Sequence, residues 1–255
     1  MTPDDPTTQP APDQSRDGSG PEGESELVLG PGVTLTPDGR PRQTIRTFTP
    51  RWRNSPLTDE RMEQLLPTFD LPEGPLDAAT AFGSEMPVVL EIGSGHGAAA
   101  IAYALAHPDH GIIAAEVHVP GVARMMAAAQ EAGATNLRVH VGDAILFLTD
   151  DVPTGSLAGV HLFFPDPWHK KRHAKRRFVQ QHTLDLVRDR LAPDGVLRIA
   201  TDIAAYAEHS LEQLERHGGF DVTVGPRPQW RPTDGFEDKG IAAGRTITDI
   251  TARPR

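Results

Sequence analysis

A short glycine-rich stretch constrains the fold of this chain more than any other feature. Residues 88–97 read VVLEIGSGHG, an apolar run that stops at an acid and three closely spaced glycines. An aliphatic, β-branched run closed by glycines predicts a buried parallel strand that enters a tight turn, and the alanine-rich residues 98–106 predict the helix that follows. Glycine lets the backbone approach a ligand closely, because a Cβ atom would fill the space that the ligand needs. The stretch therefore indicates a nucleotide-type binding crossover, with a glycine-rich turn that binds nothing as the alternative.

The spacing of these glycines narrows the choice of ligand. Gly93, Gly95 and Gly97 follow a G-x-G-x-G pattern rather than the G-x-G-x-x-G pattern of dinucleotide-binding folds, and no Gly-Lys-Ser/Thr sequence follows them. The dinucleotide fingerprint and the P-loop therefore both fit poorly. A pocket for S-adenosylmethionine (SAM) fits better.

Length and composition favour one α/β domain in a reducing compartment. The chain has 255 residues, of which 38% are hydrophobic, enough for one core of normal size. Cysteine is absent from the sequence, which excludes disulfides and thiolate chemistry. The N-terminus is acidic and proline-rich, and no apolar run approaches membrane-spanning length. We therefore expect a cytoplasmic protein with no membrane partner.

The acidic charge of the chain is concentrated at its N-terminus. The formal net charge is −10, and residues 1–40 hold eight acids against Arg16 and Arg40, a local net of −6 that leaves −4 for the remainder. Because this acidic segment is also rich in proline and glycine, we expect residues 1–40 to be a disordered tail and residues 41–255 to form the SAM-binding domain. Residues 43–53 are basic and semi-apolar, a mixture that suits packing across the core or contact with phosphate.

Strands and helices are predicted to alternate regularly after a short helix over 58–66 that Pro67 ends. Strands are expected near residues 88–92, 112–117, 137–141, 160–164 and 196–200, and helices near 98–106, 121–132, 179–191 and 203–216. Such βαβ repetition implies a parallel sheet with helices on both faces. Ligands of these sheets bind beyond the carboxyl ends of the strands.

An acid stands at or just after the end of each of the first four strands, at Glu91, Glu116, Asp143 and Asp166. Tips of adjacent parallel strands lie about 5 Å apart, so these carboxylates should converge on one crevice. Glu116 is placed to accept both ribose hydroxyls of an adenosine, and Asp143 to accept from the adenine amino group. Glu91 and the glycine turn would face the methionine half, and an acidic crevice suits a sulfonium cation.

A proline-flanked acid followed by a cationic run forms the second informative stretch. Residues 163–177 read FFPDPWHKKRHAKRR, in which two prolines hold Asp166 in a stiff turn. The lysines and arginines suit a phosphate backbone, and Trp168 offers a face for stacking on a base. A merely solvated charged surface is the alternative for residues 170–177. His169 and His173 have a helical metal spacing, but their cationic surroundings argue against a metal site.

These residues resemble the bacterial tRNA (guanine-N7-)-methyltransferases, SAM-dependent enzymes that modify the guanine at position 46 in the tRNA variable loop. The matching pieces are residues 91–97, Glu116, residues 142–144, residues 164–177, Thr201-Asp202 with Tyr206-Ala207, and Phe236-Glu237 with Lys239-Gly240. The resemblance covers the chain from about Ile45 onward. The glycine turn marks only the superfamily, whereas the stretch around Asp166 is close to diagnostic of the family.

The resemblance implies a Rossmann-like class I methyltransferase fold, with a mostly parallel seven-stranded sheet, helices on both faces, and a reversed final strand that residues 246–252 could supply. It implies SAM as the cofactor and tRNA as the partner; the residues themselves give no sign of a metal site or of an obligate protein partner. The implied SAM contacts are Glu91, Gly93, Gly95, Glu116, Asp143 and Asp166, of which Asp166 is also the catalytic residue. The implied substrate contacts are Lys170, Asp202, Asp234, Gly235, Phe236 and Glu237, and the implied RNA contacts are Arg172, His173, Lys175, Arg176 and Arg177.

One departure from the family pattern lies near the C-terminus. The family motif reads Arg-Pro-x-Thr-Lys/Arg-Phe-Glu, whereas residues 231–237 read RPTDGFE, so Asp234 and Gly235 occupy the slots of a threonine and a cation. This departure keeps open the last of three alternatives to the family's reaction. They are a SAM-dependent methyltransferase of another RNA or a small molecule, a NAD-dependent oxidoreductase, and a non-catalytic RNA-binding protein that keeps the fold.

Overall fold

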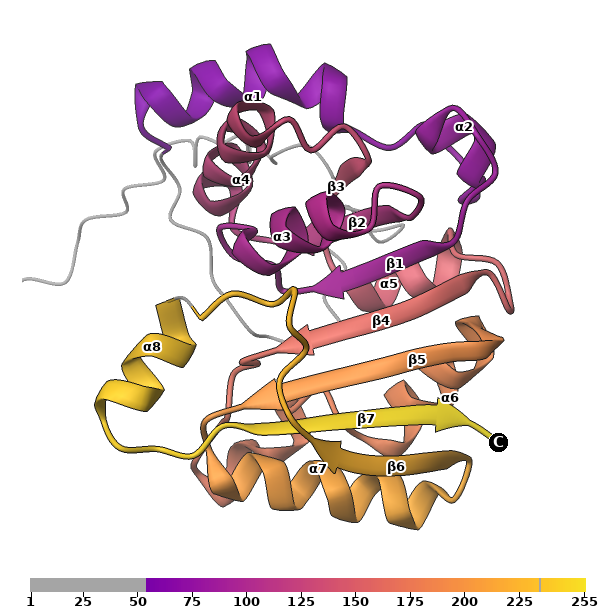
Figure 1. Ribbon diagram of the computed structural model, residues 1–255, viewed down its shortest axis with the longest axis vertical. Helices are drawn as coiled ribbons and strands as arrows, with labels where there is room; N and C mark the ends of the chain where they lie inside the picture. Colours follow the sequence, from indigo (N-terminus) through magenta and orange to yellow (C-terminus); the bar gives the residue numbers. More distant parts are fainter. Residues whose placement is uncertain (1–53, 234) are drawn as a thin grey trace, which may run out of the picture.

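The core of the protein is a seven-stranded sheet in a computed structural model that describes residues 54–233 and 235–255 (Figure 1). The strand order is β3-β2-β1-β4-β5-β7-β6, and every neighbouring pair is parallel except those that β7 makes with β5 and β6. This sheet confirms the predicted fold, including the reversed final strand. The strands are β1 (Val88–Ile92), β2 (Gly111–Glu116), β3 (Leu137–Val141), β4 (Leu157–Phe163), β5 (Leu191–Thr201), β6 (Phe220–Gly225) and β7 (Thr248–Pro254).

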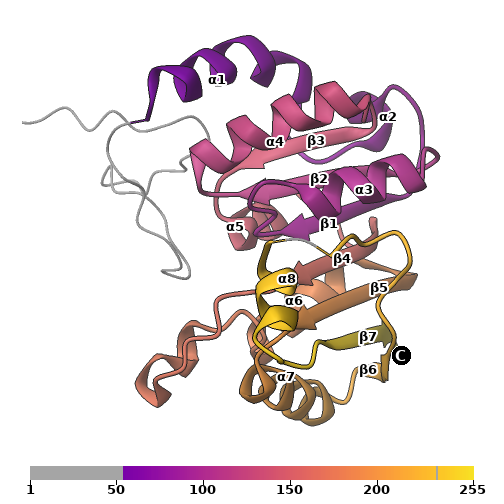
Figure 2. The ribbon, with the colours of Figure 1, turned by 60° about the vertical axis from the view of Figure 1, so that its left-hand side comes forward.

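Helices cover both faces of the sheet, as the sequence predicts (Figure 2). Strand side chains alternate between two apolar clusters, because successive residues of a strand point to opposite faces: Val88 and Leu90 join one cluster and Val89 the other. The Val89 cluster packs against α1 (Pro56–Phe69), α3 (Ala98–Ala106) and α4 (Val119–Ala132). The Leu90 cluster packs against α5 (Ala144–Asp150), α6 (Gln181–Arg190) and α7 (Ala204–His217).

The parallel register brings the carboxyl ends of the central strands to one edge. Ile92 of β1 lies beside Ala115 of β2, Glu116 beside Val141 of β3, and Phe163 of β4 beside Ala200 of β5. Helix α8 (Gly235–Ala242) lies beyond this edge, close to the arrowheads of β4 and β5 (Figure 1). Among the described residues no helix is both long and apolar enough to span a lipid bilayer.

The first helix differs from its prediction at both ends. It begins at Pro56 rather than Thr58, because Ser55 acts as the N-cap and accepts a hydrogen bond from the Thr58 amide at 3.2 Å. It also continues through Pro67, which was expected to end it, and reaches Phe69. A proline in the last turn removes one hydrogen bond, yet the Asp70 amide still donates to the Leu66 carbonyl at 2.7 Å.

Several short elements were not predicted. They are α2 (Ala78–Phe82), α5, α8, β6 and a 3-10 helix, η1 (Lys171–Arg176). Strand β5 also begins earlier than expected, because the Leu157 partner on β5 is Leu191 while the Gly159 partner is Val196, so the intervening residues bulge out of the ladder. The predictions for residues 1–40 and 43–53 fall outside the described residues.

Candidate active site

The glycine turn after β1 leaves open space where side chains would stand. Gly93, Gly95 and Gly97 have φ values of 70°, 57° and 78°, in the left-handed region that glycine adopts without strain. A Cβ atom at Gly93 or Gly95 would meet nothing within 4 Å, whereas one at Gly97 would lie 2.3 Å from Cγ of Met125. The first two glycines therefore line a cradle open to a ligand, and the third lets α4 pack against the turn.

Glu116, the last residue of β2, is held rigidly beside this turn. Its Oε2 accepts a hydrogen bond from the Gly95 amide at 2.8 Å, and its Oε1 accepts from the amides of Val117 and His118, each at 2.8 Å. Three backbone donors fix the carboxylate, while a carboxylate offers about four lone-pair sites. The glycine turn and the predicted ribose acceptor are thus one hydrogen-bonded unit.

Asp143, which follows β3, is the N-cap of α5. Its Oδ1 accepts from the Ile145 amide at 2.8 Å, which anchors the carboxylate at the same edge as Glu116. The cap is a sufficient structural reason for an acid at this position. Its contact with adenine stays a prediction.

Glu91 lies deeper than the other acids. It is 3% exposed, and its Oε2 is 3.9 Å from Nδ1 of His161, its partner on β4. Burial, with the cations Arg198 and Arg231 among the neighbours, lowers the pKa of His161 to about 3, so His161 is neutral at neutral pH. Glu91 therefore faces a neutral ring inside the protein, and its contact with SAM stays a prediction.

Asp166 stands on a turn with an unusual backbone. Phe164 and Trp168, on either side of Pro165-Asp166-Pro167, have φ values of 48° and 44°, which non-glycine residues rarely adopt. Asp166 is exposed, yet partial desolvation raises its pKa, and the negative charge of Glu116 raises it further. The two residues stand at or just after the ends of β2 and β4, whose carboxyl ends lie at the same edge of the sheet.

An open pocket of about 460 Å³ adjoins Asp166. Its lining residues are Asp166, Pro167, Trp168, His169, Lys170 and His173. The predicted catalytic residue, the predicted substrate contact Lys170 and the predicted RNA contact His173 therefore share one cavity. Figure 2 shows the segment that follows β4, in salmon, projecting from the carboxyl edge of the sheet.

The basic segment, residues 170–177, contacts Trp168 and Pro167. The Arg176 guanidinium lies 4.8 Å from the centre of the Trp168 ring, and His173 meets the same ring edge-on at 5.7 Å. Desolvation and then the cations Arg176, Arg172 and Lys170 lower the pKa of His173. Arg172 and Lys175 are exposed, whereas Arg177 is half-buried and its Nε donates to the Pro167 carbonyl at 3.0 Å.

The predicted substrate contacts in and near α8 have different environments. Phe236 is 67% exposed, Gly235 is exposed at the start of the helix, and Asp234 falls outside the described residues. Glu237 is 3% exposed, and its carboxylate lies 3.4 Å from Nη2 of Arg231. Asp202, just after β5, accepts from Arg245 at 2.8 Å.

Sequence reasoning gave no role to a buried cluster that braces this edge. Arg231 is 1% exposed and donates to both carboxylate oxygens of Asp249 on β7 at 2.9 Å, while the Trp230 ring stacks on His161 at 5.1 Å. The guanidinium also lies 4.9 Å from the centre of the Phe163 ring at the end of β4. A histidine inside the apolar run LAGVHLF and an arginine before α8 were the available signals. A single sequence does not show that they meet.

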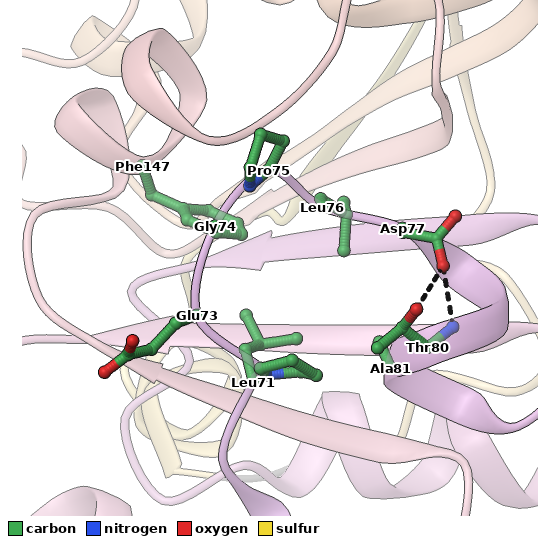
Figure 3. A pocket seen from close by; sticks show the side chains of 10 residues that line it. Leu71, Glu73, Gly74, Pro75, Leu76, Asp77, Thr80, Ala81 and Phe147 are labelled. Atoms are coloured by element: carbon green, nitrogen blue, oxygen red, sulfur yellow. Dashed lines mark hydrogen bonds between the residues drawn. The ribbon is translucent and has the colours of Figure 1, made fainter.

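A second, smaller hollow of about 110 Å³ is formed by loop 71–77, α2 and Phe147 (Figure 3). Asp77, one of the two acids that line it, caps α2 and accepts from the amide and the hydroxyl of Thr80, at 2.8 and 2.5 Å (Figure 3). The Asp77 carboxylate is thus already bound within the local structure.

Within the described ranges there is no group of three or more His, Asp or Glu that could hold a metal ion.

Known proteins resemble this chain in sequence and in fold. Residues 85–250 match the protein family described as "Putative methyltransferase". A solved 30S ribosomal A1408 methyltransferase from an uncultured bacterium superposes with a TM-score of 0.50 at 12% identity, over 74% of this chain and 98% of that chain, a likeness of fold alone.

Relatives much closer in sequence share a single description. The tRNA (guanine-N(7)-)-methyltransferase of Aeromonas hydrophila is 44% identical over 84% of this chain and 93% of its own length. The protein of the same description from Streptomyces coelicolor is 41% identical over 82% of this chain and 80% of its own length. This chain therefore belongs to the tRNA (guanine-N(7)-)-methyltransferase family.

Proposed function

We propose that this protein transfers the methyl group of SAM to N7 of a guanine in tRNA, at position 46 of the variable loop. The observation that carries the proposal is the convergence of three features at one sheet edge, in a chain of this family. They are the open glycine cradle with its clamped Glu116, the carboxylate of Asp166, and the basic segment beside it.

The described residues fit SAM. Gly93 and Gly95 leave room for a ligand, and Glu116, with three of its roughly four lone-pair sites taken by backbone amides, would accept from a ribose hydroxyl with the one that remains. Asp143 would accept from the adenine amino group, and Glu91 would face the methionine half. When bound, SAM supplies a methyl group made electrophilic by its sulfonium sulfur. An edge with several carboxylates also attracts that cation.

In this reaction the protein has to align the guanine with the methyl group, and it does not have to transfer a proton. Guanine N7 carries a lone pair and no proton, so the displacement needs no general base. Asp166 would orient the guanine by accepting from its N1–H or amino group, and would stabilise the positive charge that the ring gains. A stiff turn suits this role, because small displacements of an orienting group cost much of the rate.

The basic segment is the proposed tRNA contact. Arg172, His173, Lys175 and Arg176 would meet phosphates, with Lys170 and Asp202 nearer the base. Phe236 is exposed on α8, where it can reach the same substrate. Because tRNA is the partner, the cytoplasm is the proposed location.

The direct test is methyl transfer from tritiated SAM to total tRNA, followed by nucleoside analysis. The expected product is 7-methylguanosine, absent when the tRNA lacks a guanine at position 46. Label in another nucleoside would assign a different RNA reaction. SAM binding without labelled product would instead support a binding protein that keeps the fold, which the Asp234-Gly235 departure leaves as the competing reading.

A further inference from the structure

We propose that Arg177 is a positioning residue that holds the Asp166 turn in place, and that it does not contact tRNA as its neighbours do. The inference rests on the proposed role of Asp166 in the transfer. It separates Arg177 from Arg172, Lys175 and Arg176, which the sequence groups with it as one basic run.

The Asp166 turn, residues 164–168, has few backbone amides that could stabilise it. Pro165 and Pro167 have no amide hydrogen, so neither can donate a hydrogen bond. Phe164 and Trp168 both have positive φ, a backbone state that costs free energy and persists where surrounding contacts impose it. On its first side the Phe164 amide donates to the Ala200 carbonyl at 2.8 Å, so it is the Pro167 side that needs a donor from elsewhere in the chain.

Arg177 supplies that donor. Its Nε donates to the Pro167 carbonyl at 3.0 Å, one residue after Asp166. Its guanidinium also lies 5.8 Å from the centre of the Tyr206 ring, a fully buried ring near the start of α7. Arg177 therefore links the turn to the body of the protein.

Two neighbours in the basic run, Arg172 and Lys175, differ from Arg177 in exposure. Arg172 and Lys175 are exposed, and the Nε of Arg172 lies 3.2 Å from Nε2 of His173 within the same basic segment. Arg177 is half-buried and its amide donates to the Ala174 carbonyl at 3.0 Å, which closes η1. Because its Nε donates to the Pro167 carbonyl, Arg177 helps to fix the position of the Asp166 turn.

Lysine at this position distinguishes the two roles. Arg177→Lys keeps the positive charge that a phosphate contact requires, but it places a methylene group where Nε donates. If Arg177 positions the turn, the single-turnover rate of methyl transfer falls by about tenfold, since misplacement of an orienting group by about 1 Å costs up to 100-fold. The dissociation constant for tRNA and its dependence on salt stay as in the wild type.

The experiment measures single-turnover methylation and tRNA binding between 50 and 200 mM salt, a range in which each phosphate contact contributes about one unit of slope. It compares Arg177→Lys and Arg177→Ala with Lys175→Ala on the same segment. Arg216→Ala, exposed at the end of α7, controls for loss of a charge. Lys175→Ala should weaken binding and flatten the salt dependence.

The proposal is overturned if Arg177→Lys behaves as the wild type while Arg177→Ala weakens binding and flattens the salt dependence as Lys175→Ala does. It is equally overturned if both Arg177 variants keep the wild-type rate. Thermal unfolding confirms that each variant is folded, and Arg177→Lys remains informative if Arg177→Ala is not. Failure of the wild type itself to form 7-methylguanosine would instead reject the proposed function.

Discussion

The amide of Gly95 donates a hydrogen bond to Oε2 of Glu116 across 2.8 Å and so joins the turn after β1 to the tip of β2. The two residues are 21 positions apart in sequence and belong to different strand ends. The bond sets the carboxylate before any ligand arrives, so less ordering remains to be done on binding. Because the carboxylate is already in place in the free protein, the contribution of Glu116 can be measured as SAM affinity, without measuring methyl transfer.

Glu116→Gln should weaken SAM binding about tenfold or more. The substitution removes one charge that attracts the sulfonium, and it replaces an acceptor oxygen by an NH₂ group that opposes the backbone amides. Isothermal titration with SAM measures the effect. Glu215→Gln, exposed on α7, is the matched control and should bind SAM as the wild type does. Equal affinity in both variants would remove Glu116 from the cofactor site.

Asp166→Asn should reduce the single-turnover rate about 100-fold, the scale seen when one preorganised electrostatic contact is lost. Thermal unfolding should show that the variant is folded, and tRNA affinity should change little, because the basic segment is intact. Rapid-quench measurement of labelled tRNA gives the rate. A rate within a few-fold of the wild type would show that Asp166 does not assist the transfer.

The pH dependence of the reaction should report the charge on Asp166. Desolvation and the Glu116 charge raise the pKa of Asp166, so the ionised form is lost, and activity falls, at a higher pH than for an ordinary aspartate. In Glu116→Gln at saturating SAM the acid limb should move to lower pH, because one of the two causes is gone. The measurement is the single-turnover rate against pH in both proteins. An acid limb that moves to higher pH or stays fixed would contradict the effect of the Glu116 charge on the pKa of Asp166.

Arg231→Gln should lower the free energy of unfolding by about 3–5 kcal/mol, because it leaves the carboxylates of Asp249 and Glu237 without their buried cation. Arg255→Gln breaks an ion pair of similar length, 2.7 Å to Asp221, but its side chains are 57% and 70% exposed. That variant should lose less than about 1 kcal/mol. Urea denaturation compares the two, and losses of equal size would contradict the assignment of Arg231 as a buried brace.

His161 should make the protein less stable in mild acid. Its pKa is about 3 in the folded state and near 6.5 when unfolded, so the unfolded chain binds the extra proton as pH falls between those values. By this linkage the histidine alone lowers the free energy of unfolding by about 2 kcal/mol from pH 7 to pH 5. In His161→Gln the drop should be smaller by that amount, as measured by urea denaturation at both pH values. The same drop in both proteins would show that His161 titrates normally.

The parts of the fold that follow from local pattern could be predicted from the sequence. Strand β1 and helix α3 have their predicted bounds, because an aliphatic run closed by glycines and an alanine-rich run each favour one local structure. That Glu116 and Asp166 follow strands ending at one edge was also predictable, because parallel topology gathers the carboxyl ends of strands there. By contrast, Pro67 was predicted to end a helix that continues to Phe69.

What could not be predicted depends on contacts between distant segments. Arg231 meets Asp249 across 18 positions, and Trp230 stacks on His161 from another element entirely. Composition also suggested that residues 170–177 act as one cationic surface, whereas Arg177 bonds to Pro167. Charge pattern shows which residues attract phosphate, and only packing shows which of them are already engaged.

The position of β7 between β5 and β6 has a consequence for how the enzyme is made. Residues 248–254 insert between two strands that precede them in the chain, and they carry the Asp249 that receives Arg231. During synthesis the glycine turn and the acids of β1 to β4 emerge long before this strand. The brace behind the Asp166 edge therefore forms only after the glycine turn and these acids have been synthesised, so early stretches of the growing polypeptide lack the ion pair that stabilises this edge.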